Sequence, residues 1–170
     1  MESLGESSEV AVETMQLSDW EQVRAIYLSG IASGDATFET EAPSRELWEA
    51  THISSPRLVA RSGERILGWA ALSRVSSREA YRGVAEVSVY VAEMARGRGV
   101  GRMLLEALVA GSEREGFWTL QASVFPENEA SVRLHLRCGF REVGRRERIG
   151  RLNGVWRSTL LLERRSLQHS

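Results

Sequence analysis

Hydrophobic and polar positions along the chain switch repeatedly between a period of two and a period of 3.6, a pattern that indicates alternating strands and helices. Apolar and polar residues alternate over positions 10–12, so a short first strand is expected there. Ser18 and Glu21 have the spacing of a capping box and precede an apolar stripe, which predicts a helix that Gly34 ends. A second, shorter helix is expected over residues 44–53.

The middle of the chain has the pattern of three strands. Residues 58–60 and 66–75 flank Ser62-Gly63-Glu64, which is typical of a hairpin turn. Residues 84–92 alternate strictly and predict the third strand. One of its faces carries Val87, Val89 and Val91, and the other carries Glu86, Ser88 and Tyr90. Glu86 therefore places a carboxylate within an otherwise apolar strand, which is costly unless that group has partners or a function.

The last third predicts a helix, a strand, a second helix and a closing hairpin. An apolar stripe at helical spacing begins at Val100 and indicates a long helix that ends near Gly116. A strand is expected over residues 118–125 and a helix over 129–137. The two final strands flank Asn153-Gly154, a strong signal for a tight hairpin turn.

The predicted order is β-α-α-β-β-β-α-β-α-β-β, an α/β (α+β) fold with a mixed, partly antiparallel central sheet flanked by helices. A length of 170 residues with 42% hydrophobic residues fits one globular domain, which is expected over residues 9–163. Residues 1–8 and 164–170 are polar and aperiodic, so both are expected to be flexible tails.

Composition excludes several classes of function. The net charge of −1 provides no attraction for a polyanion or an anionic surface, so neither a nucleic-acid nor a membrane partner is expected. The single cysteine, Cys138, excludes an internal disulfide, and His52 and His169 have no companions for a metal site, so no metal is expected. The first nine residues hold three acidic and no basic side chains, which together with the short apolar runs predicts a cytoplasmic protein.

A glycine-rich segment, Arg96-Gly97-Arg98-Gly99-Val100-Gly101, lies between a predicted strand and a predicted helix. Glycines let the backbone bend so that several N–H groups point the same way, and the start of a helix favours an anion. The segment therefore predicts a phosphate cradle, with a flexible connection as the alternative. Arg102 stands where the dinucleotide fingerprint needs its third glycine, and the Gly-Lys-Ser/Thr end of a Walker loop is missing.

Five motifs in order resemble one enzyme family. They are Ala36-Thr37-Phe38-Glu39, Ala80-Tyr81-Arg82, Glu86-x-Ser88-Val89-Tyr90-Val91, Arg96-x-x-Gly99-x-Gly101, and Ser131-Val132-Arg133-Leu134-His135 followed by Gly139-Phe140. The set is similar to the GNAT (Gcn5-related) N-acetyltransferase superfamily, in its phosphinothricin/methionine sulfoximine acetyltransferase branch. The order and spacing hold from about residue 9 to residue 163.

The resemblance implies the GNAT fold and transfer of acetyl from acetyl-CoA to the α-amino group of a small amino acid or analogue, in a direct ternary complex. An α-amino group with a pKa of about 8 is mostly protonated at neutral pH, so the reaction needs a base. The family position of that base matches Glu86, and a second position near the thioester matches His135. The alternatives are a carboxylate on a solvated sheet face for Glu86 and a structural histidine for His135.

The resemblance also implies which residues bind the cosubstrate and the acceptor. Acetyl-CoA would pair with the backbone of Val89, Tyr90 and Val91, and its pyrophosphate would lie on Arg96, Gly97, Arg98, Gly99, Val100, Gly101 and Arg102. Asn128 and Arg137 match positions near the pantetheine arm, with a helix N-cap as the alternative for Asn128. Phe38, Arg78 and Tyr81 match the acceptor pocket. The branch commonly forms homodimers, so a homodimer is expected.

Two departures from the branch lie near the expected acceptor pocket. Gly83-Val84 stands where the branch commonly has Trp or His followed by Thr, and Leu152-Asn153 stands where a basic pair is often found. They leave the positions for acetyl-CoA intact, and they count against specificity for the herbicide analogues. Two alternative functions also stay open: a non-catalytic acyl-CoA-binding sensor, and an acetyltransferase acting on the N-terminus of a peptide or protein.

Overall fold

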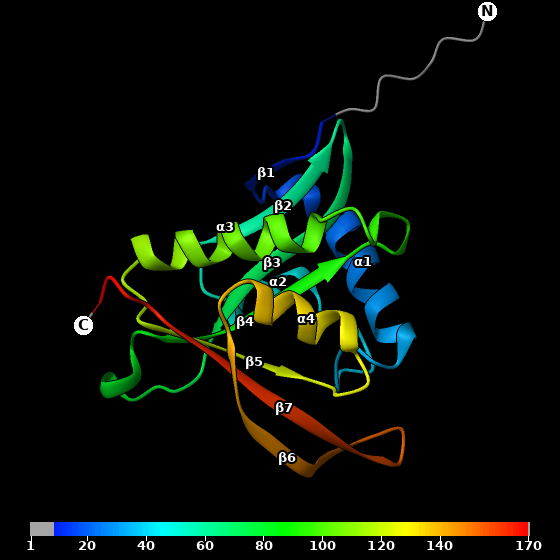
Figure 1. Cartoon of the computed structure of the whole chain (residues 1–170). Coiled ribbons are helices and arrows are strands. Elements are labelled where there is room, and N and C mark those ends of the chain that lie inside the picture. Colours follow the sequence, from blue (N-terminus) through cyan, green and yellow to red (C-terminus); the bar gives the residue numbers. More distant parts are fainter. Residues whose placement is uncertain (1–8, 170) are drawn as a thin grey trace, which may run out of the picture.

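A computed structural model describes residues 9–169, which fold around one seven-stranded sheet (Figure 1). The strands are β1 (Ala11–Thr14), β2 (Arg57–Ser62), β3 (Arg65–Arg74), β4 (Val84–Val91), β5 (Thr119–Val124), β6 (Arg141–Leu152) and β7 (Val155–Arg165). The helices are α1 (Trp20–Ser33), α2 (Arg45–Thr51), α3 (Val100–Arg114) and α4 (Glu129–Arg137). The predicted order of elements and the α/β fold class are therefore confirmed.

The strand order in the sheet is β1-β2-β3-β4-β5-β7-β6, and every neighbouring pair is antiparallel except β4 and β5. Helix α3 makes the crossover between these two parallel strands, as a parallel connection requires. The expected mixed, partly antiparallel sheet is confirmed. The two halves of the sheet meet only at the β4–β5 pair.

Strands β4 and β5 pair over three positions and then diverge. The paired positions are Val84 with Thr119, Ala85 with Leu120, and Glu86 with Gln121. Strand β4 continues to Val91 with its other edge still paired to β3, so its edge toward β5 carries no ladder beyond Glu86. The sheet therefore opens at its centre, next to the one carboxylate in β4.

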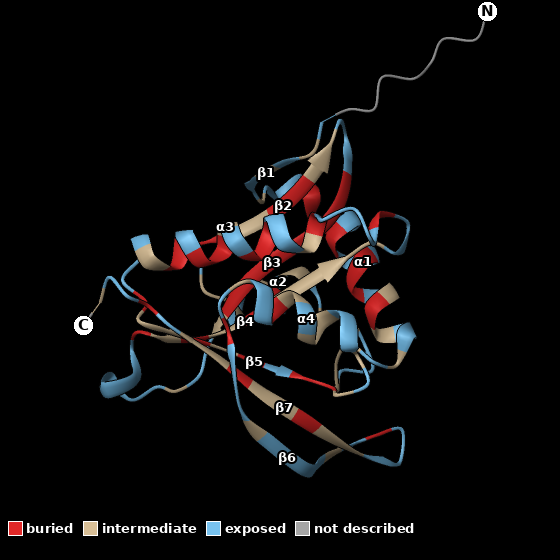
Figure 2. Cartoon of the chain, in the orientation of Figure 1, coloured by how far each residue is buried: buried red, intermediate tan, exposed pale blue. Residues whose placement is uncertain are grey.

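The two faces of the sheet carry separate hydrophobic clusters. On one face, α3 buries the predicted stripe, with Leu104, Leu105 and Leu108 fully enclosed (Figure 2). On the other, α1 and α2 bury an aromatic group that includes Trp20, Tyr27, Trp48 and Trp69. Alternate residues of β3 supply both clusters because successive side chains of a strand point to opposite faces. The cluster under α3 also includes Leu120 and Ala122 of β5 and Leu162 of β7, so it packs against both halves of the sheet.

The start of α1 differs from the expected capping box. The backbone N–H of Gln16 donates to the Asp19 carboxylate at 2.8 Å, and a 3-10 turn at Leu17–Asp19 leads into the helix at Trp20. Asp19 is buried and accepts a further bond from Arg61 at 2.6 Å. The capping box thus joins Gln16 and Asp19 instead of Ser18 and Glu21, and it belongs to the 3-10 turn before α1. Gly34 ends the helix in the left-handed region, at φ 76°, as predicted.

The C-terminal segment is more ordered at its start than expected. Strand β7 runs to Arg165, and Ser166 is buried. Both Arg164 Nη1, at 3.0 Å, and Ser166 Oγ, at 3.1 Å, donate to the carboxylate of Glu113 on α3. The expectation of a flexible tail from residue 164 is therefore wrong for Arg164, Arg165 and Ser166. The expected tail at residues 1–8 lies outside the described residues.

Candidate active site

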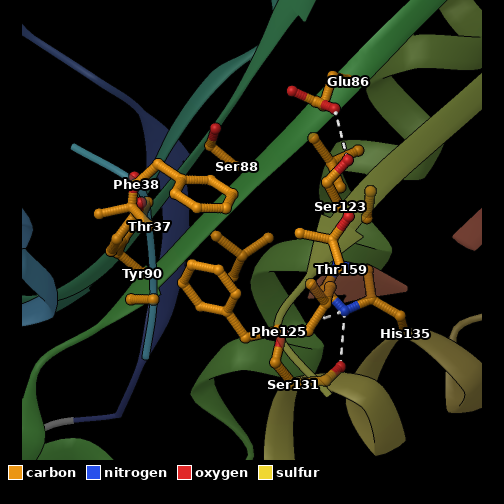
Figure 3. A pocket seen from close by; sticks show the side chains of 15 residues that line it. Thr37, Phe38, Glu86, Ser88, Tyr90, Ser123, Phe125, Ser131, His135 and Thr159 are labelled. Carbon is orange, nitrogen blue, oxygen red and sulfur yellow. Dashed lines mark hydrogen bonds between the residues drawn. The ribbon is translucent and has the colours of Figure 1, made fainter. Parts of the chain in front are cut away.

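A cavity of about 220 Å³ fills the opening between β4 and β5 (Figure 3). Five parts of the chain line it: residues 36–38 after α1, residues 86–90 of β4, residues 122–125 at the end of β5, Ser131 and His135 of α4, and Thr159 of β7. The opening of the sheet thus places Glu86, His135 and Phe38, three residues expected to act on substrate, around one space.

Glu86 lies where β4 and β5 part, as the last residue of the parallel ladder. Its Oε1 accepts hydrogen bonds from Gln121 Nε2 at 3.2 Å and from Ser123 Oγ at 3.4 Å, both on β5. These donors fix the carboxylate at the cavity without neutralising it, because neither is cationic. The arrangement suits a group that accepts a proton from a substrate.

His135 is buried on α4 and its protonation follows from its contacts. Its Nδ1 lies 2.6 Å from the carbonyl oxygen of Ser131, which only accepts, so Nδ1 carries the proton and Nε2 has a free lone pair. Burial lowers the pKa of His135, and the hydrogen bond to Ser131 opposes this only in part. The ring is therefore neutral at neutral pH, and Nε2 is a proton acceptor.

The glycine-rich loop connects the end of β4 to α3 and presents open backbone. Gly97 and Gly99 have φ values of 76° and 78°, and nothing lies within 4 Å of where a Cβ would be at either position. Gly99 is the N-cap of α3 and contributes no side-chain cap, so the first N–H groups of the helix stay available to an anion. The predicted phosphate cradle therefore has the required backbone form.

The basic residues of this loop differ in their surroundings. Arg96 and Arg98 are exposed, and within residues 9–169 neither forms an ion pair. Arg102 instead binds Glu106 on its own helix at 2.7 Å. Arg137 is exposed in the last turn of α4. Arg96 and Arg98 thus have guanidinium groups free for an anion, whereas Arg102 offers its backbone N–H.

Asn128 uses both ends of its side-chain amide within the protein. Its Oδ1 accepts from Ser131 N at 3.2 Å as the N-cap of α4, and its Nδ2 donates to the carbonyl of Asp35 at 3.1 Å. The capping alternative is therefore present in the structure. The additional bond to Asp35 was missed, because nothing in the sequence places residues 93 positions apart side by side.

The expected acceptor residues do not all lie together. Phe38 lines the cavity and meets Phe125 edge-on, with ring centroids 4.9 Å apart. Arg78 and Tyr81 are exposed on the connection between β3 and β4 and are not among the residues that line the cavity. Arg78 and Tyr81 therefore have no shared wall with Phe38 in this structure.

Several residues of the cavity were not singled out from the sequence. Ser123, Phe125 and Thr159 all line it, and Thr159 is buried although polar. They come from strands whose pairing in the sheet no local pattern reveals. The one local signal was Thr159 itself, a polar residue just before the apolar run at the end of β7.

Comparison with known proteins finds acetyltransferases. The acetyltransferase (GNAT) family matches residues 17–140 of the chain. A phosphinothricin N-acetyltransferase of Alcaligenes faecalis is 35% identical over 90% of this chain and 81% of its own length. An L-methionine sulfoximine/L-methionine sulfone acetyltransferase of Pseudomonas aeruginosa is 32% identical over 82% of this chain and 85% of its own length.

Solved structures agree on the fold as well. The crystal structure of a phosphinothricin acetyltransferase from Sinorhizobium meliloti in complex with acetyl-CoA superposes with a TM-score of 0.85 and 26% identity, covering 95% of this chain and 90% of that one. The fold expected from the five motifs is confirmed. From the family match over most of its length and from these relatives, the chain belongs to the acetyltransferase (GNAT) family.

Proposed function

We propose that the protein transfers acetyl from acetyl-CoA to the α-amino group of a small amino acid or analogue. The observation that carries this proposal is the opening between β4 and β5, which has a carboxylate at its apex and a neutral histidine in its wall. The relatives named above act on phosphinothricin and on methionine sulfoximine or sulfone, and the bound acetyl-CoA of the Sinorhizobium meliloti enzyme supports the same cosubstrate here.

The form of the site supports binding of acetyl-CoA. The edge of β4 that faces β5 carries free backbone groups from Val87 to Val91, and an extended amide-containing arm can pair with them as an added strand. The pyrophosphate would lie on the loop at Arg96–Arg102, where open glycines meet the start of α3. Both features follow from the chain's own geometry, and they support a binding mode in which the thioester lies in the cavity.

The reaction removes two protons from the nitrogen of the acceptor and delivers one proton to the sulfur of CoA. The ammonium of the acceptor gives its proton to the Glu86 carboxylate, directly or through water, and the neutral nitrogen attacks the thioester carbonyl. The new C–N bond forms as the C–S bond breaks. The nitrogen gives up its second proton in this step, and the CoA thiolate takes up one proton as it leaves. His135 assists through Nε2, which holds the lone pair that its Nδ1–H bond to Ser131 leaves free.

The acceptor fits best as a small molecule with an apolar part. Phe38 and Phe125 form an aromatic wall of the cavity, and Glu86 is the one acidic residue in its lining. The described lining contains no arginine, so a substrate carboxylate would be bound from outside it. We keep Arg78 and Tyr81 as proposed acceptor contacts because both side chains are exposed and free to reach a bound molecule.

We also propose a cytoplasmic homodimer. Strand β6 is an edge strand with exposed apolar side chains at Val143 and Ile149, and Trp156 on the neighbouring β7 is half exposed. Such a surface suits a second copy of the chain. No helix among the described residues is long and apolar enough to cross a membrane. Light scattering coupled to gel filtration measures the assembly directly.

The function is tested by following thiol release from acetyl-CoA with a panel of amines. The panel holds phosphinothricin, methionine sulfoximine, methionine, other free amino acids, a polyamine, an aminoglycoside and a short peptide. We expect release with a small amino acid or analogue and none with the peptide. Release with the peptide alone would indicate an N-terminal acetyltransferase, and binding of CoA without release from any amine would indicate a sensor.

A further inference from the structure

Arg157 on β7 joins the two halves of the molecule beyond the end of β5, where the sheet is open. Its Nη1 donates to the carbonyl of Gly34 at 2.8 Å, and its Nη2 donates to the Asp35 carboxylate at 2.9 Å and to Glu127 at 3.4 Å. Gly34 and Asp35 follow α1, which packs on the N-terminal half of the sheet, whereas Glu127 follows β5. The guanidinium thus spans the opening.

A second contact holds the same segment. Asn128 donates to the backbone carbonyl of Asp35 at 3.1 Å, so both the side chain and the main chain of Asp35 are bound from the C-terminal half. The Arg157 side chain is only 15% exposed, whereas the carboxylates of Asp35 and Glu127 are 53% and 58% exposed, so the bond to the Gly34 carbonyl is the most sheltered of its contacts. Residues 34–35 are therefore fixed relative to β7 and α4, although they are far from both in sequence.

The same guanidinium also supports the aromatic wall of the cavity. It lies over the ring of Phe125 with its central carbon 4.0 Å from the ring centroid. Phe125 in turn meets Phe38, which is three residues beyond Asp35. A Cβ at Gly150 would come within 2.9 Å of the Phe38 ring, so β6 packs closely against this ring. Phe38 thus contacts both Phe125 and β6, at the end of a segment that Arg157 anchors.

We infer that Arg157 is a positioning residue that holds Phe38 against Phe125 and so limits the size of the acceptor that the cavity admits. The inference rests on the proposed function, because it assigns specificity for the acceptor amine. Arg157 itself is not among the residues that line the cavity, and no described contact joins it to the glycine-rich loop at residues 96–102. It should therefore affect the acceptor and not acetyl-CoA.

The test compares Arg157→Leu, Arg157→Lys and Asp35→Asn with the wild type, using methionine sulfoximine and tryptophan as the small and the bulky acceptor. Arg141→Leu is the matched control, because Arg141 is exposed on β6 and pairs with Glu163 away from the cavity. Thermal unfolding confirms that each variant is folded. Asp35→Asn keeps the shape of the side chain, so it preserves the test if Arg157→Leu does not fold.

We expect Arg157→Leu to raise the KM for methionine sulfoximine on the order of tenfold and to shift the ratio of kcat/KM toward tryptophan, because several charge-assisted bonds are lost. The KM for acetyl-CoA should stay within about twofold, since Arg157 does not touch the loop that holds it. Arg157→Lys keeps the charge, so its KM for methionine sulfoximine should lie between those of the wild type and Arg157→Leu. The double variant with Asp35→Asn should be no worse than Arg157→Leu alone.

The inference is overturned if Arg157→Leu and Asp35→Asn change thermal stability but leave the acceptor KM and the size preference as in the wild type. It is also overturned if the KM for acetyl-CoA rises as much as that for the acceptor. Amide hydrogen exchange at residues 34–39 distinguishes failure of the inference about Arg157 from failure of the proposed function. If the wild type acetylates neither amine, the function fails, and faster exchange in Arg157→Leu still supports the anchor while unchanged exchange refutes it.

Discussion

Glu86 and Gln121 are the last cross-strand partners of β4 and β5, and the Gln121 side chain donates to the Glu86 carboxylate at 3.2 Å. The pair marks the point where the parallel ladder ends and the cavity begins. Gln121 therefore orients the carboxylate toward the opening, and the strand divergence supplies the space in front of it. The backbone geometry and the proposed proton acceptor thus depend on the same two residues.

Gln121→Leu removes this donor while keeping the size of the side chain. We expect kcat to fall on the order of tenfold, because Glu86 keeps only the longer bond to Ser123 and loses part of its orientation. Binding of acetyl-CoA, measured by calorimetry, should not change. A kcat equal to that of the wild type would show that the Glu86–Gln121 bond has no part in catalysis.

His135→Asn distinguishes the roles of the two ring nitrogens. The asparagine amide can replace Nδ1–H as a donor to the Ser131 carbonyl, but it leaves no proton acceptor at the position of Nε2. We expect kcat to fall by about tenfold or more while the variant stays folded. If kcat is unaffected in steady-state assays, His135 is a structural residue of α4.

Stability should fall on the acid side of neutrality. Burial lowers the pKa of both His135 and His52 in the folded protein, so the unfolded chain binds protons there before the folded one does. The free energy of unfolding should therefore be steady above about pH 6.5 and decrease as the pH falls below it. Urea unfolding of the wild type and of His135→Asn measures this. An equal loss of stability in both proteins would contradict the assignment to His135.

Gly99→Ala and Gly116→Ala form a matched pair at the two ends of α3. Both glycines have positive φ values, 78° and 86°, with open space at the Cβ position, so each alanine should cost about 1–2 kcal/mol in backbone strain. Only Gly99 belongs to the proposed phosphate cradle. We expect Gly99→Ala to weaken acetyl-CoA binding on the order of tenfold and Gly116→Ala to leave the Kd unchanged. Equal Kd values for acetyl-CoA in the two variants, measured by calorimetry, would show that the pyrophosphate does not bind at this loop.

Arg78→Ala tests the proposed acceptor contact that the cavity does not include. If Arg78 binds the substrate carboxylate, its loss should raise the KM for methionine on the order of tenfold and leave the KM for methionine amide unchanged. Arg82→Ala is the control, because Arg82 lies over Trp118 and pairs with Glu79. An unchanged KM for methionine would show that a group other than Arg78 binds the substrate carboxylate.

Local patterns predicted the elements well, because the periodicity of apolar residues follows directly from burial of one face. The stripe of α3, the alternation of β4 and the turn at Asn153-Gly154 are each visible within a few residues of sequence. The start of α1 was predicted wrongly because the capping box forms between Gln16 and Asp19 and not between Ser18 and Glu21. Both pairs have the same spacing, so spacing alone does not distinguish them.

Long-range placement limited the prediction of the site. The motifs brought Glu86, His135 and Phe38 to one cavity, as the resemblance implied. Arg157 and Asp35 are 122 positions apart, and Phe125 meets Phe38 although the two rings come from distant parts of the chain. Such contacts depend on strand order, which hydrophobic periodicity does not encode. Arg157 therefore emerged only from the structure.

The central claim is that Glu86 removes the proton from the acceptor amine. Its most direct test is thiol release from acetyl-CoA with methionine sulfoximine for the wild type and Glu86→Gln, alongside calorimetric binding of acetyl-CoA. The account predicts turnover by the wild type, a kcat that is lower by about 100-fold or more in Glu86→Gln, and an unchanged Kd for acetyl-CoA. Wild-type turnover that persists at the same kcat in Glu86→Gln would contradict it.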